Sequence, residues 1–541
     1  SPIKFKCENF SFLRSQSVLH PSLALHSLLC TERQNYSNTG FCFRIHHFKS
    51  VSPARIRNDT DVSNTDTCNG SQILIRVMGG EVFRNSYLLE YFPQMMMKHA
   101  WDNYKLYAWG KNELRPISKR GHTSSIFGSS NLGATILDGL DTLYIMGMDK
   151  EFKEGRDWIA ENLNMDTIVS DLSVFETTIR FVGGLLTCFA LTGDTLFRDK
   201  AQHVAEKLLP AFSTPTGIPH SLINPSTGIS KNYGWASGGS SILSEIGTLH
   251  LEFAYLSDVT GNPIYREKVE RVRRVLRDME KPRGLYPNYI NPKTGKWGQH
   301  HMSLGGLGDS YYEYLLKTWL QNKDDFESRQ MFDDAMRAII DNMIRVSNSG
   351  LTYVADLKYD RILEDKMDHL SCFSGGLFAL GSKTLKTSLS DKYMELARGL
   401  TNTCHESYDR SATKLGPEAF RFSDAVEAKA LKSNEKYYIL RPETIESYFI
   451  LWRLTKDQKY REWGWEALQA IEKHCRVDSG YTGIRNVYLL DSPKDDVQQS
   501  FFLYLYLLFS DDSLISLDEW VFNTEAHPLP IKGNPFYRNA H

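Results

Sequence analysis

One local pattern constrains the fold more than any other: a helical segment that is apolar on almost every side, usually followed by a charged amphipathic segment. The apolar member occurs seven times, with starts near Gly133, Glu176, Glu245, Asp309, His369, Glu443 and Ser500. Charged partners lie at 194–209, 262–280, 325–347, 390–407 and 457–474. A helix that is apolar all round has to be buried, and an amphipathic helix offers one face with which to cover it.

The spacing of these units favours helical hairpins over a solenoid of copied repeats, because it varies from roughly 43 to 72 residues. An inner ring of seven helices inside an outer ring of amphipathic ones buries all the apolar segments together. We therefore predict an all-α chain, an (α/α)7 toroid of seven helical hairpins. Strand-like stretches are expected only around 284–289, 351–355 and 480–484.

The pattern also divides the chain. Residues 1–84 are rich in Ser, Asn, Thr and His and lack helical periodicity, so we expect a largely disordered leader there. The (α/α)7 domain is predicted to fill 85–532, with a C-terminal tail at 533–541. No window holds eighteen consecutive apolar residues, so we expect membrane attachment only through an anchor that is not seen in this chain. The net charge of −2 gives no basic field, and no nucleic-acid partner is expected.

Carboxylates gather near the starts of the apolar segments. In a ring, the beginnings of the inner helices meet at one mouth, so acids placed there are expected to converge. The set consists of Glu176 with Arg180 one turn later, Glu245, Asp309 with Glu313, and Glu443 with Glu446. Any one of these acids has an alternative role in stabilising a helix N-terminus through the macrodipole. As a group with apolar neighbours, they predict a buried acidic cluster that needs cations, shared protons or a metal.

Such a cluster suits one kind of chemistry better than others. Inverting hydrolysis of a glycosidic bond needs two separated carboxyl groups, one to protonate the leaving oxygen and one to activate water on the opposite face of the sugar. Additional carboxylate and backbone oxygens suit a hard cation such as Ca²⁺. The sequence contains no HExxH, GxSxG, Walker A or dinucleotide-binding fingerprint.

Four longer motifs carry a resemblance to a known family. They are Ser173-Val-Phe-Glu-Thr-Thr-Ile-Arg, Gly306-Leu-Gly-Asp-Ser-Tyr-Tyr-Glu-Tyr-Leu, Leu440-Arg-Pro-Glu-Thr-Ile-Glu-Ser and Phe522-Asn-Thr-Glu-Ala-His-Pro-Leu-Pro-Ile. In this order they resemble the class I α-1,2-mannosidases of glycoside hydrolase family 47, over about residues 85 to 532. The resemblance implies an (α/α)7 catalytic domain that removes mannose from high-mannose N-glycans with inversion, with Ca²⁺ as cofactor.

The resemblance also implies roles for individual residues. Glu176 would be the general acid, Asp309 the second carboxylate on the acid side, and Glu443 the base that activates water. Thr524 would bind calcium through its carbonyl and its hydroxyl. Metal-bound waters or the sugar would be held by Glu245, Glu446 and Glu525, and the pocket would be completed by Arg180, His369 and Arg441. Cys372 and Cys404 match the family's disulfide, which fits an oxidising compartment.

Within the family, the segment around Leu307 looks like the Golgi subgroup. Endoplasmic reticulum members tend to carry Arg at this position, and a smaller apolar side chain should leave a roomier cavity. We therefore expect several α-1,2-linked mannoses to be removed. The expected setting is the lumen of the secretory pathway, the Golgi first and the endoplasmic reticulum second, and the expected state is a monomer.

The seventh apolar segment departs from the family pattern. Relatives carry Ala-Glu-Thr-Leu-Lys at the point where this chain joins Leu503 directly to Tyr504, so five residues are absent, including a glutamate of the metal and sugar site. We expect a shortened seventh inner helix and weaker binding of calcium and sugar.

Two other readings stay open at this point. A glycan-binding or quality-control protein with impaired turnover would fit the shortened helix. A different helical toroid, such as a lyase or an isomerase, would be recognised by an unsaturated product or a retained anomer.

Overall fold

Helices make up most of the computed structural model, which describes residues 86–123, 126–498 and 502–540. The predicted leader at 1–84 lies outside the described residues. The prediction of a mostly helical fold is confirmed for the remainder.

The apolar segments form helices that are buried over nearly their whole length. α12, for example, is buried from Ser310 to Gln321, as expected for a helix that is apolar or aromatic on every side. These helices are α4 (Ala134–Ile145), α6 (Val174–Glu176), the π-helical η3 (Thr177–Val182), α7 (Gly183–Thr192), α9 (Leu243–Gly247), α10 (His250–Thr260), α12 (Asp309–Gln321), η7 (His369–Cys372), α14 (Phe373–Leu385), α16 (Glu443–Thr455) and α18 (Phe502–Phe509).

One of the predicted apolar helices is in fact two. The segment that begins near Glu245 breaks between α9 and α10, where Thr248 and Leu249 leave the helical region of backbone space. Gly247 lies directly before the break, and a Cβ there would meet Cδ2 of Tyr311 at 2.3 Å, so a side chain at this position would not fit against α12.

The amphipathic helices have one buried face each. On α11 the buried residues Tyr265, Val269, Val272 and Leu276 recur every three or four positions, which is the stripe expected for a helix covering a core. This second set comprises α3 (Ser86–Ala108), α5 (Asp149–Asn162), α8 (Thr195–Leu208), α11 (Ile264–Asp278), α13 (Phe326–Asn342), α15 (Ser390–Asp409) and α17 (Lys459–His474).

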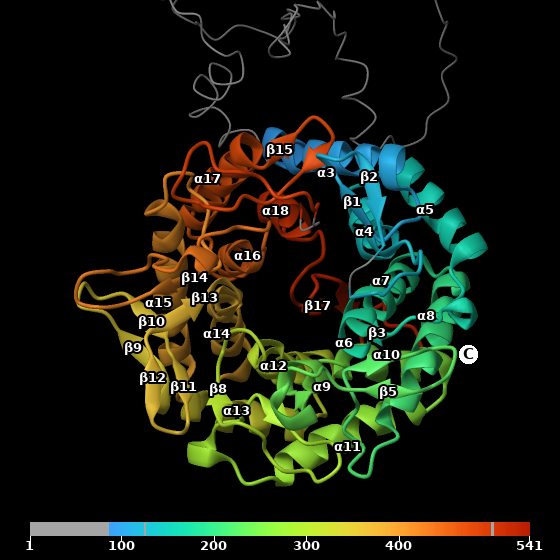
Figure 1. Ribbon diagram of the computed structural model, residues 1–541, viewed down its shortest axis with the longest axis horizontal. Helices are drawn as coiled ribbons and strands as arrows, with labels where there is room; N and C mark the ends of the chain where they lie inside the picture. The colour runs from blue at the N-terminus through green and yellow to red at the C-terminus, as the bar shows by residue number, and fades with distance from the viewer. Residues whose placement is uncertain (1–85, 124–125, 499–501, 541) are drawn as a thin grey trace, which may run out of the picture. The chain divides into compact units, whose positions relative to one another are not determined.

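The two sets pair in sequence order, and inner helices pack on their successors. α4 packs on α5, α7 on α8, α10 on α11, α12 on α13, α14 on α15 and α16 on α17. The inner helices α4, α7, α10, α12, α14, α16 and α18 contact one another in that succession. The first helix, α3, packs on the last, α18, so the pairing joins the two ends of this part of the chain (Figure 1).

The fold also contains short antiparallel strands, most of which the sequence did not predict, so the prediction of an all-α chain is wrong in this respect. No described strand exceeds three residues, so no alternating pattern is long enough to recognise. The pairs are β1 (Glu113–Arg115) with β2 (Arg120–His122), β3 (Leu172–Ser173) with β4 (Leu222–Ile223) and β4 with β5 (Ser230–Lys231), β6 (Ser241–Ile242) with β7 (Tyr289–Ile290), β8 (His301–Met302) with β11 (Asp356–Lys358) and β11 with β12 (Ile362–Glu364), β9 (Ile344–Val346) with β10 (Thr352–Val354), β13 (Lys366–Asp368) with β14 (Ala419–Arg421), β15 (Arg476–Val477) with β16 (Gly480–Tyr481), and β17 (Trp520–Phe522) with β18 (Pro528–Pro530). Of the three strand-like stretches that were expected, 351–355 contains β10 and 480–484 contains β16, whereas 284–289 overlaps β7 only at Tyr289.

The β17–β18 hairpin carries the closing sequence motif to the inner helices. The Asn523 amide donates to the carbonyl of Ile179 and to Glu252 Oε1, at 2.8 Å each. The predicted C-terminal tail is also anchored: Arg538 Nε donates to the carbonyl of Phe189 at 3.1 Å, and Tyr537 hydrogen bonds to Asp258.

One described segment, Val174–Thr192, is long and apolar enough to pass a test for a membrane span by length and composition. It runs through α6, η3 and α7, and 78% of its apolar window is buried inside the fold. Here these properties belong to a core helix.

Candidate active site

Arg180 binds three carboxylates that come from distant parts of the chain. Its Nε donates to Glu176 Oε2 and its Nη1 to Asp138 Oδ2, at 2.9 Å each, and Nη1 also pairs with Glu525. Local structure positions Glu176: its backbone N–H donates to the Ser173 hydroxyl at 3.2 Å, which caps the start of the helix. The side chains of Arg180 and Glu176 are 25% and 21% exposed, so solvent reaches this group.

A single guanidinium cannot neutralise three carboxylates. Burial, with the neighbouring Asp138 and Glu176, raises the pKa of Glu525 to about 8 against the opposing effect of Arg180. His527 adds a second cation: although burial favours its neutral form, Asp141 and Asp138 raise its pKa to about 10. Its Nδ1 lies 2.7 Å from Asp141 Oδ2 and its Nε2 lies 3.2 Å from Asp138 Oδ1. The group therefore retains an excess of negative charge.

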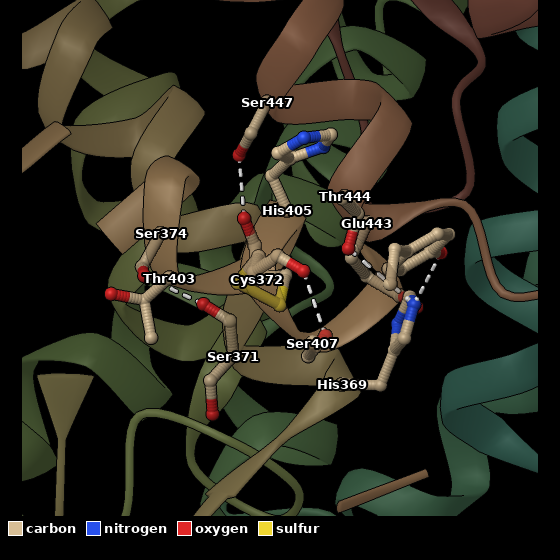
Figure 2. Close-up of a disulfide and its surroundings, with 12 residues drawn as sticks. His369, Ser371, Cys372, Ser374, Thr403, His405, Ser407, Glu443, Thr444 and Ser447 are labelled. Atoms are coloured by element: carbon tan, nitrogen blue, oxygen red, sulfur yellow. Dashed lines mark hydrogen bonds and ion pairs between the residues drawn. A yellow bond between two sulfur atoms is a disulfide. The ribbon is translucent and has the colours of Figure 1, made fainter. Parts of the chain in front are cut away.

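Glu443 lies at the first position of α16 and pairs with a buried histidine. His369 Nδ1 is 2.7 Å from Glu443 Oε2 (Figure 2). Burial alone would raise the pKa of Glu443, but His369 and Arg441 lower it below its usual value. Glu443 is therefore ionised at neutral pH, which is the state that a general base requires.

Asp309 stands in the opposite electrostatic situation. Burial raises its pKa to about 7, and the nearby Glu313 and Glu443 add to the rise, while the Ser310 N–H opposes it. On the same helix, the buried Lys317 ammonium pairs with Glu313 and lies 3.7 Å from Glu446 Oε1. The acidic cluster thus already contains one lysine, which the sequence analysis did not identify.

Two further acids retain a buried oxygen without a hydrogen-bond partner among the described residues, namely Glu245 Oε2 and Glu252 Oε2. Burial raises the pKa of each to about 7. Glu252 accepts from Tyr314 and from Asn523, the residue before Thr524, and the Thr524 N–H lies 3.5 Å from the Tyr314 hydroxyl. The peptide of Thr524 is therefore held beside α10 and α12.

Arg441 occupies the loop before α16, and its Nη2 donates to Glu418 Oε1 at 2.7 Å. The preceding Leu440 has a φ of 63°, and Leu307, two residues before Asp309, has a φ of 79°. Left-handed backbone at non-glycine residues costs about 1–2 kcal/mol and is frequent at functional sites. Both strained leucines precede an acid that was predicted to be catalytic.

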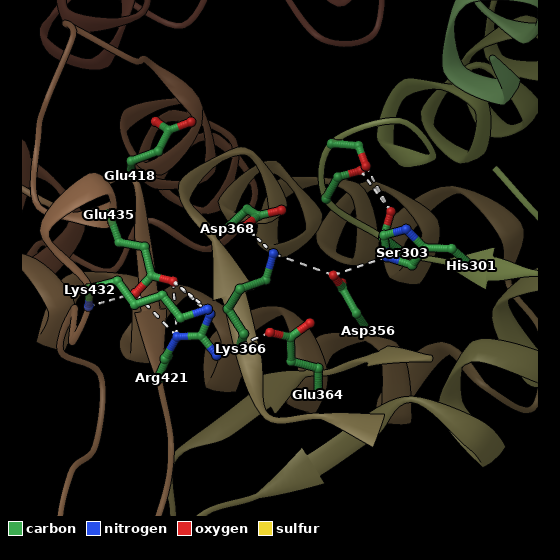
Figure 3. Close-up of polar contacts among 12 residues, drawn as sticks. His301, Ser303, Asp356, Glu364, Lys366, Asp368, Glu418, Arg421, Lys432 and Glu435 are labelled. Carbon is green, nitrogen blue, oxygen red and sulfur yellow. Dashed lines mark hydrogen bonds and ion pairs between the residues drawn. The ribbon is translucent and has the colours of Figure 1, made fainter. Parts of the chain in front are cut away.

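A network of ion pairs supports the strands that lead to His369 (Figure 3). The Lys366 ammonium lies 2.7 Å from Asp368 Oδ1 and 3.4 Å from Asp356 Oδ2. Arg421, on the neighbouring strand β14, pairs with Glu435 and Glu364. Asp368 directly precedes His369 and also lies against Gly305, where a Cβ would come within 2.9 Å of its carboxylate. The network therefore joins the loop before α12 to the strand before η7.

The predicted residues fall into connected groups. One group consists of Arg180, Glu176 and Glu525, and Glu245 lies near Glu176. The other consists of Glu443, His369 and Arg441. Near Glu443 lie Glu446 and Asp309. The predicted disulfide between Cys372 and Cys404 is present. Sequence reasoning missed Asp138, His527, Lys317, Glu252 and Glu418. The one signal available for His527 was its place in the closing motif.

The donor set can be tested for the cation that it was predicted to hold. Among the described residues, no three His, Cys, Asp or Glu side chains are close enough to bind a metal together. The unpartnered oxygens of Glu245 and Glu252 and the raised pKa values nevertheless indicate a lack of positive charge. Hard oxygen donors of this kind fit Ca²⁺ when the direct ligands are the oxygens of Thr524 and the carboxylates act through water.

Comparison with known proteins gives a consistent result. The model of the family described as "Glycosyl hydrolase family 47" matches residues 96–531. Mannosyl-oligosaccharide alpha-1,2-mannosidase IA of Drosophila melanogaster is 72% identical over 452 residues, which cover 82% of this chain and 68% of that protein. Mannosyl-oligosaccharide 1,2-alpha-mannosidase IB of Homo sapiens is 57% identical over 457 residues, covering 82% and 71%. The solved structure of an alpha-1,2-mannosidase from Trichoderma reesei superposes with a TM-score of 0.75 at 29% identity, covering 82% of this chain and 99% of that one.

Proposed function

This chain belongs to glycosyl hydrolase family 47, and on that premise we propose that it is a mannosyl-oligosaccharide α-1,2-mannosidase that trims high-mannose N-glycans. The observation that carries the proposal is the extent of the match, which runs from 96 to 531 and includes every group of acids described above. High identity to mannosidases over the same region supports it.

We assign the chemical roles as follows. Glu176 donates its proton to the glycosidic oxygen as the bond to C1 of the terminal mannose breaks. Glu443 removes a proton from a water that attacks C1 from the opposite face, so the new hydroxyl has the inverted configuration. The ionised state of Glu443 supports its role as the base. Asp309, whose raised pKa favours a protonated carboxyl, belongs to the acid side of the reaction.

Other residues bind and orient. Arg180 fixes the Glu176 carboxylate through Nε, and its Nη1 is shared by Glu525 and Asp138. His369 hydrogen bonds to Glu443, and the charge of Arg441, which is paired with Glu418, favours the ionised form of Glu443. Glu245, Glu446 and Glu525 have raised pKa values and are suited to bind sugar hydroxyls or metal-bound water.

We further propose Ca²⁺ as cofactor, with Thr524 as its direct ligand. When bound, the ion would supply positive charge to the excess of buried carboxylates and to oxygen atoms of the substrate. The unpartnered carboxylate oxygens of Glu245 and Glu252 support this assignment. The hydrogen bonds of Asn523 that hold the Thr524 peptide beside the inner helices support it as well.

The finer features are proposed on the same basis. The helix pairs are arranged as an (α/α)7 barrel within a catalytic domain at 85–532, and the protein acts as a monomer in the lumen of the secretory pathway, the Golgi first. Leu307 in place of a larger cationic side chain favours removal of several mannoses. Its intermediate exposure is consistent with a side chain that borders the substrate.

An impaired glycan-binding protein is the second candidate, and one observation favours it. α18 has only eight described residues, and in place of an acid Tyr504 comes close to the cluster, where its phenol lies near Glu446. The described residues of α18 are all apolar or aromatic, so this helix contributes no carboxylate to the cluster.

Incubation with a high-mannose N-glycan separates the two candidates. The mannosidase is expected to release free mannose, with loss of activity in a chelator and recovery in Ca²⁺, and NMR of the fresh product should detect inversion. Glu443→Gln should abolish release and keep the melting temperature. Glu462→Gln, the same change on the exposed face of α17, serves as the control. Glycan binding without release would favour the second candidate, and a retained anomer would refute the inverting mechanism.

A further inference from the structure

His369 lies between the proposed base and a buried phenol. Its Nδ1 is 2.7 Å from Glu443 Oε2, and its Nε2 is 2.7 Å from the Tyr408 hydroxyl. A second hydroxyl, that of Thr444, lies 3.4 Å from the same Nε2. His369 and Thr444 have no exposed surface, and Tyr408 is 3% exposed, so water does not compete for these bonds.

The hydrogen-bond chemistry fixes the direction of this chain. An ionised carboxylate only accepts hydrogen bonds, so Nδ1 of His369 carries the proton that it donates to Glu443. In a neutral imidazole, Nε2 then has a free lone pair and needs a donor. Burial raises the pKa of Tyr408, so its hydroxyl keeps its proton and is available as that donor.

A disulfide joins the two segments that carry His369 and Tyr408. His369 begins η7, and Cys372 ends it three residues later. Cys404 lies on α15 four residues before Tyr408, on the same helix face. The Cys372–Cys404 disulfide therefore joins the two short segments that carry the histidine and the phenol (Figure 2).

We propose that Tyr408 is a positioning residue for the reaction: its hydroxyl donates to His369 Nε2, selects the tautomer that donates from Nδ1, and so keeps the Glu443 carboxylate ionised and oriented as the base. This inference rests on the proposed function. Tyr408 itself does not contact the substrate or the attacking water in this scheme, and it acts entirely through His369.

Charged and titratable groups from several elements surround Glu443. Glu446 lies on the same helix as Glu443, and Arg441 lies on the loop before it. Asp309 comes from α12 and His369 from η7. The phenols of Tyr408 and Tyr438 also lie near Glu443. The acids and burial favour the protonated form of Glu443, whereas His369 and Arg441 favour the ionised form. Weakening the bond from His369 should therefore raise the pKa of Glu443.

The test is the pH dependence of mannose release by Tyr408→Phe. We expect kcat to fall about tenfold and KM to stay within about twofold, because the hydroxyl orients the base and does not touch the sugar. The acidic limb of the kcat/KM profile, which reports the base of the free enzyme, should move to higher pH by about one unit.

Tyr448→Phe is the matched control. Tyr448 is equally buried and its hydroxyl also bonds to a histidine, His405 Nδ1 at 3.1 Å, but that pair does not touch Glu443. It should leave the acidic limb in place. In a His369→Gln background, Tyr408→Phe should produce no further shift, because the proposed effect passes through His369.

The outcomes are separable. Absence of mannose release by the unaltered protein refutes the proposed function, whereas release with identical profiles for Tyr408→Phe and Tyr448→Phe refutes only the role of Tyr408. If Tyr408→Phe does not fold, NMR of the unaltered protein labelled with ¹⁵N-histidine decides. A neutral ring with its proton on Nδ1 of His369 supports the proposal, whereas a proton on Nε2, in a neutral or a doubly protonated ring, overturns it.

Discussion

Lys317 provides the sharpest test of the electrostatic reasoning. Its side chain is 3% exposed and pairs with Glu313, which is 4% exposed, while Glu446 lies 3.7 Å away. Lys317→Met keeps most of the length and apolar stem but leaves the two acids without their lysine. Removing one partner of a buried ion pair costs about 3–5 kcal/mol, because the other charge stays buried and uncompensated.

The expected change in melting temperature follows from the size of the folding unit, Ser86–His541. Unfolding entropy near 60 °C is about 2.1 cal/mol/K per residue, or about 1 kcal/mol/K for roughly 450 residues. Lys317→Met should therefore lower the melting temperature by about 3–5 °C. Differential scanning calorimetry at a fixed scan rate, in chelator at neutral pH, measures the shift.

Two companion variants identify the cause. Lys153→Met removes an ion pair of the same helical spacing from the surface of α5, where the lysine is 74% exposed, and should leave the melting temperature unchanged. Lys317→Met combined with Glu313→Gln should recover most of the loss, because Glu313, the closer of the two acids, no longer carries a charge. The reasoning is refuted if the single variant melts like the wild type or if the double variant melts no higher than the single one.

Three further predictions concern stability. Cys372→Ala with Cys404→Ala removes a link across 32 residues and should lower stability by about 3–4 kcal/mol, measured by calorimetry against the oxidised wild type. Lys386→Gly, at a C-cap with a φ of 54°, should raise stability by about 0.5–1 kcal/mol in the same assay. Burial lowers the pKa of His405 to about 4, so the unfolded chain binds a proton that the folded chain does not between pH 6.5 and about 4, and stability falls as pH falls through that window. His405→Gln should flatten this part of the melting-temperature profile, and an unchanged slope would contradict the assignment.

The helices were predictable because all-round apolarity and amphipathic spacing are local properties. α12 and α16 begin at Asp309 and Glu443, the residues where the sequence placed their starts. The break before α10 was not predictable from the local pattern, and the close approach of Gly247 to Tyr311 beside it joins residues far apart in the sequence.

The site divides in the same way. The bond from Arg180 to Glu176 spans one helical turn and could be anticipated, but Asp138 is 42 residues away and Glu525 is 345 residues away. Their convergence on one guanidinium follows from ring packing and from the β17–β18 hairpin. The motif resemblance suggested Glu525. It gave no indication of Asp138, which lies with Asp141 in an otherwise largely apolar segment.

The pairing of α3 with α18 has a consequence for biosynthesis. α3 leaves the ribosome first among the described helices, yet the helix that covers it is made last. The face of α3 that α18 covers therefore stays exposed until nearly the end of translation. A message truncated before Phe502 would leave that face of α3 uncovered, and the nascent chain should bind chaperones until its final segment is released.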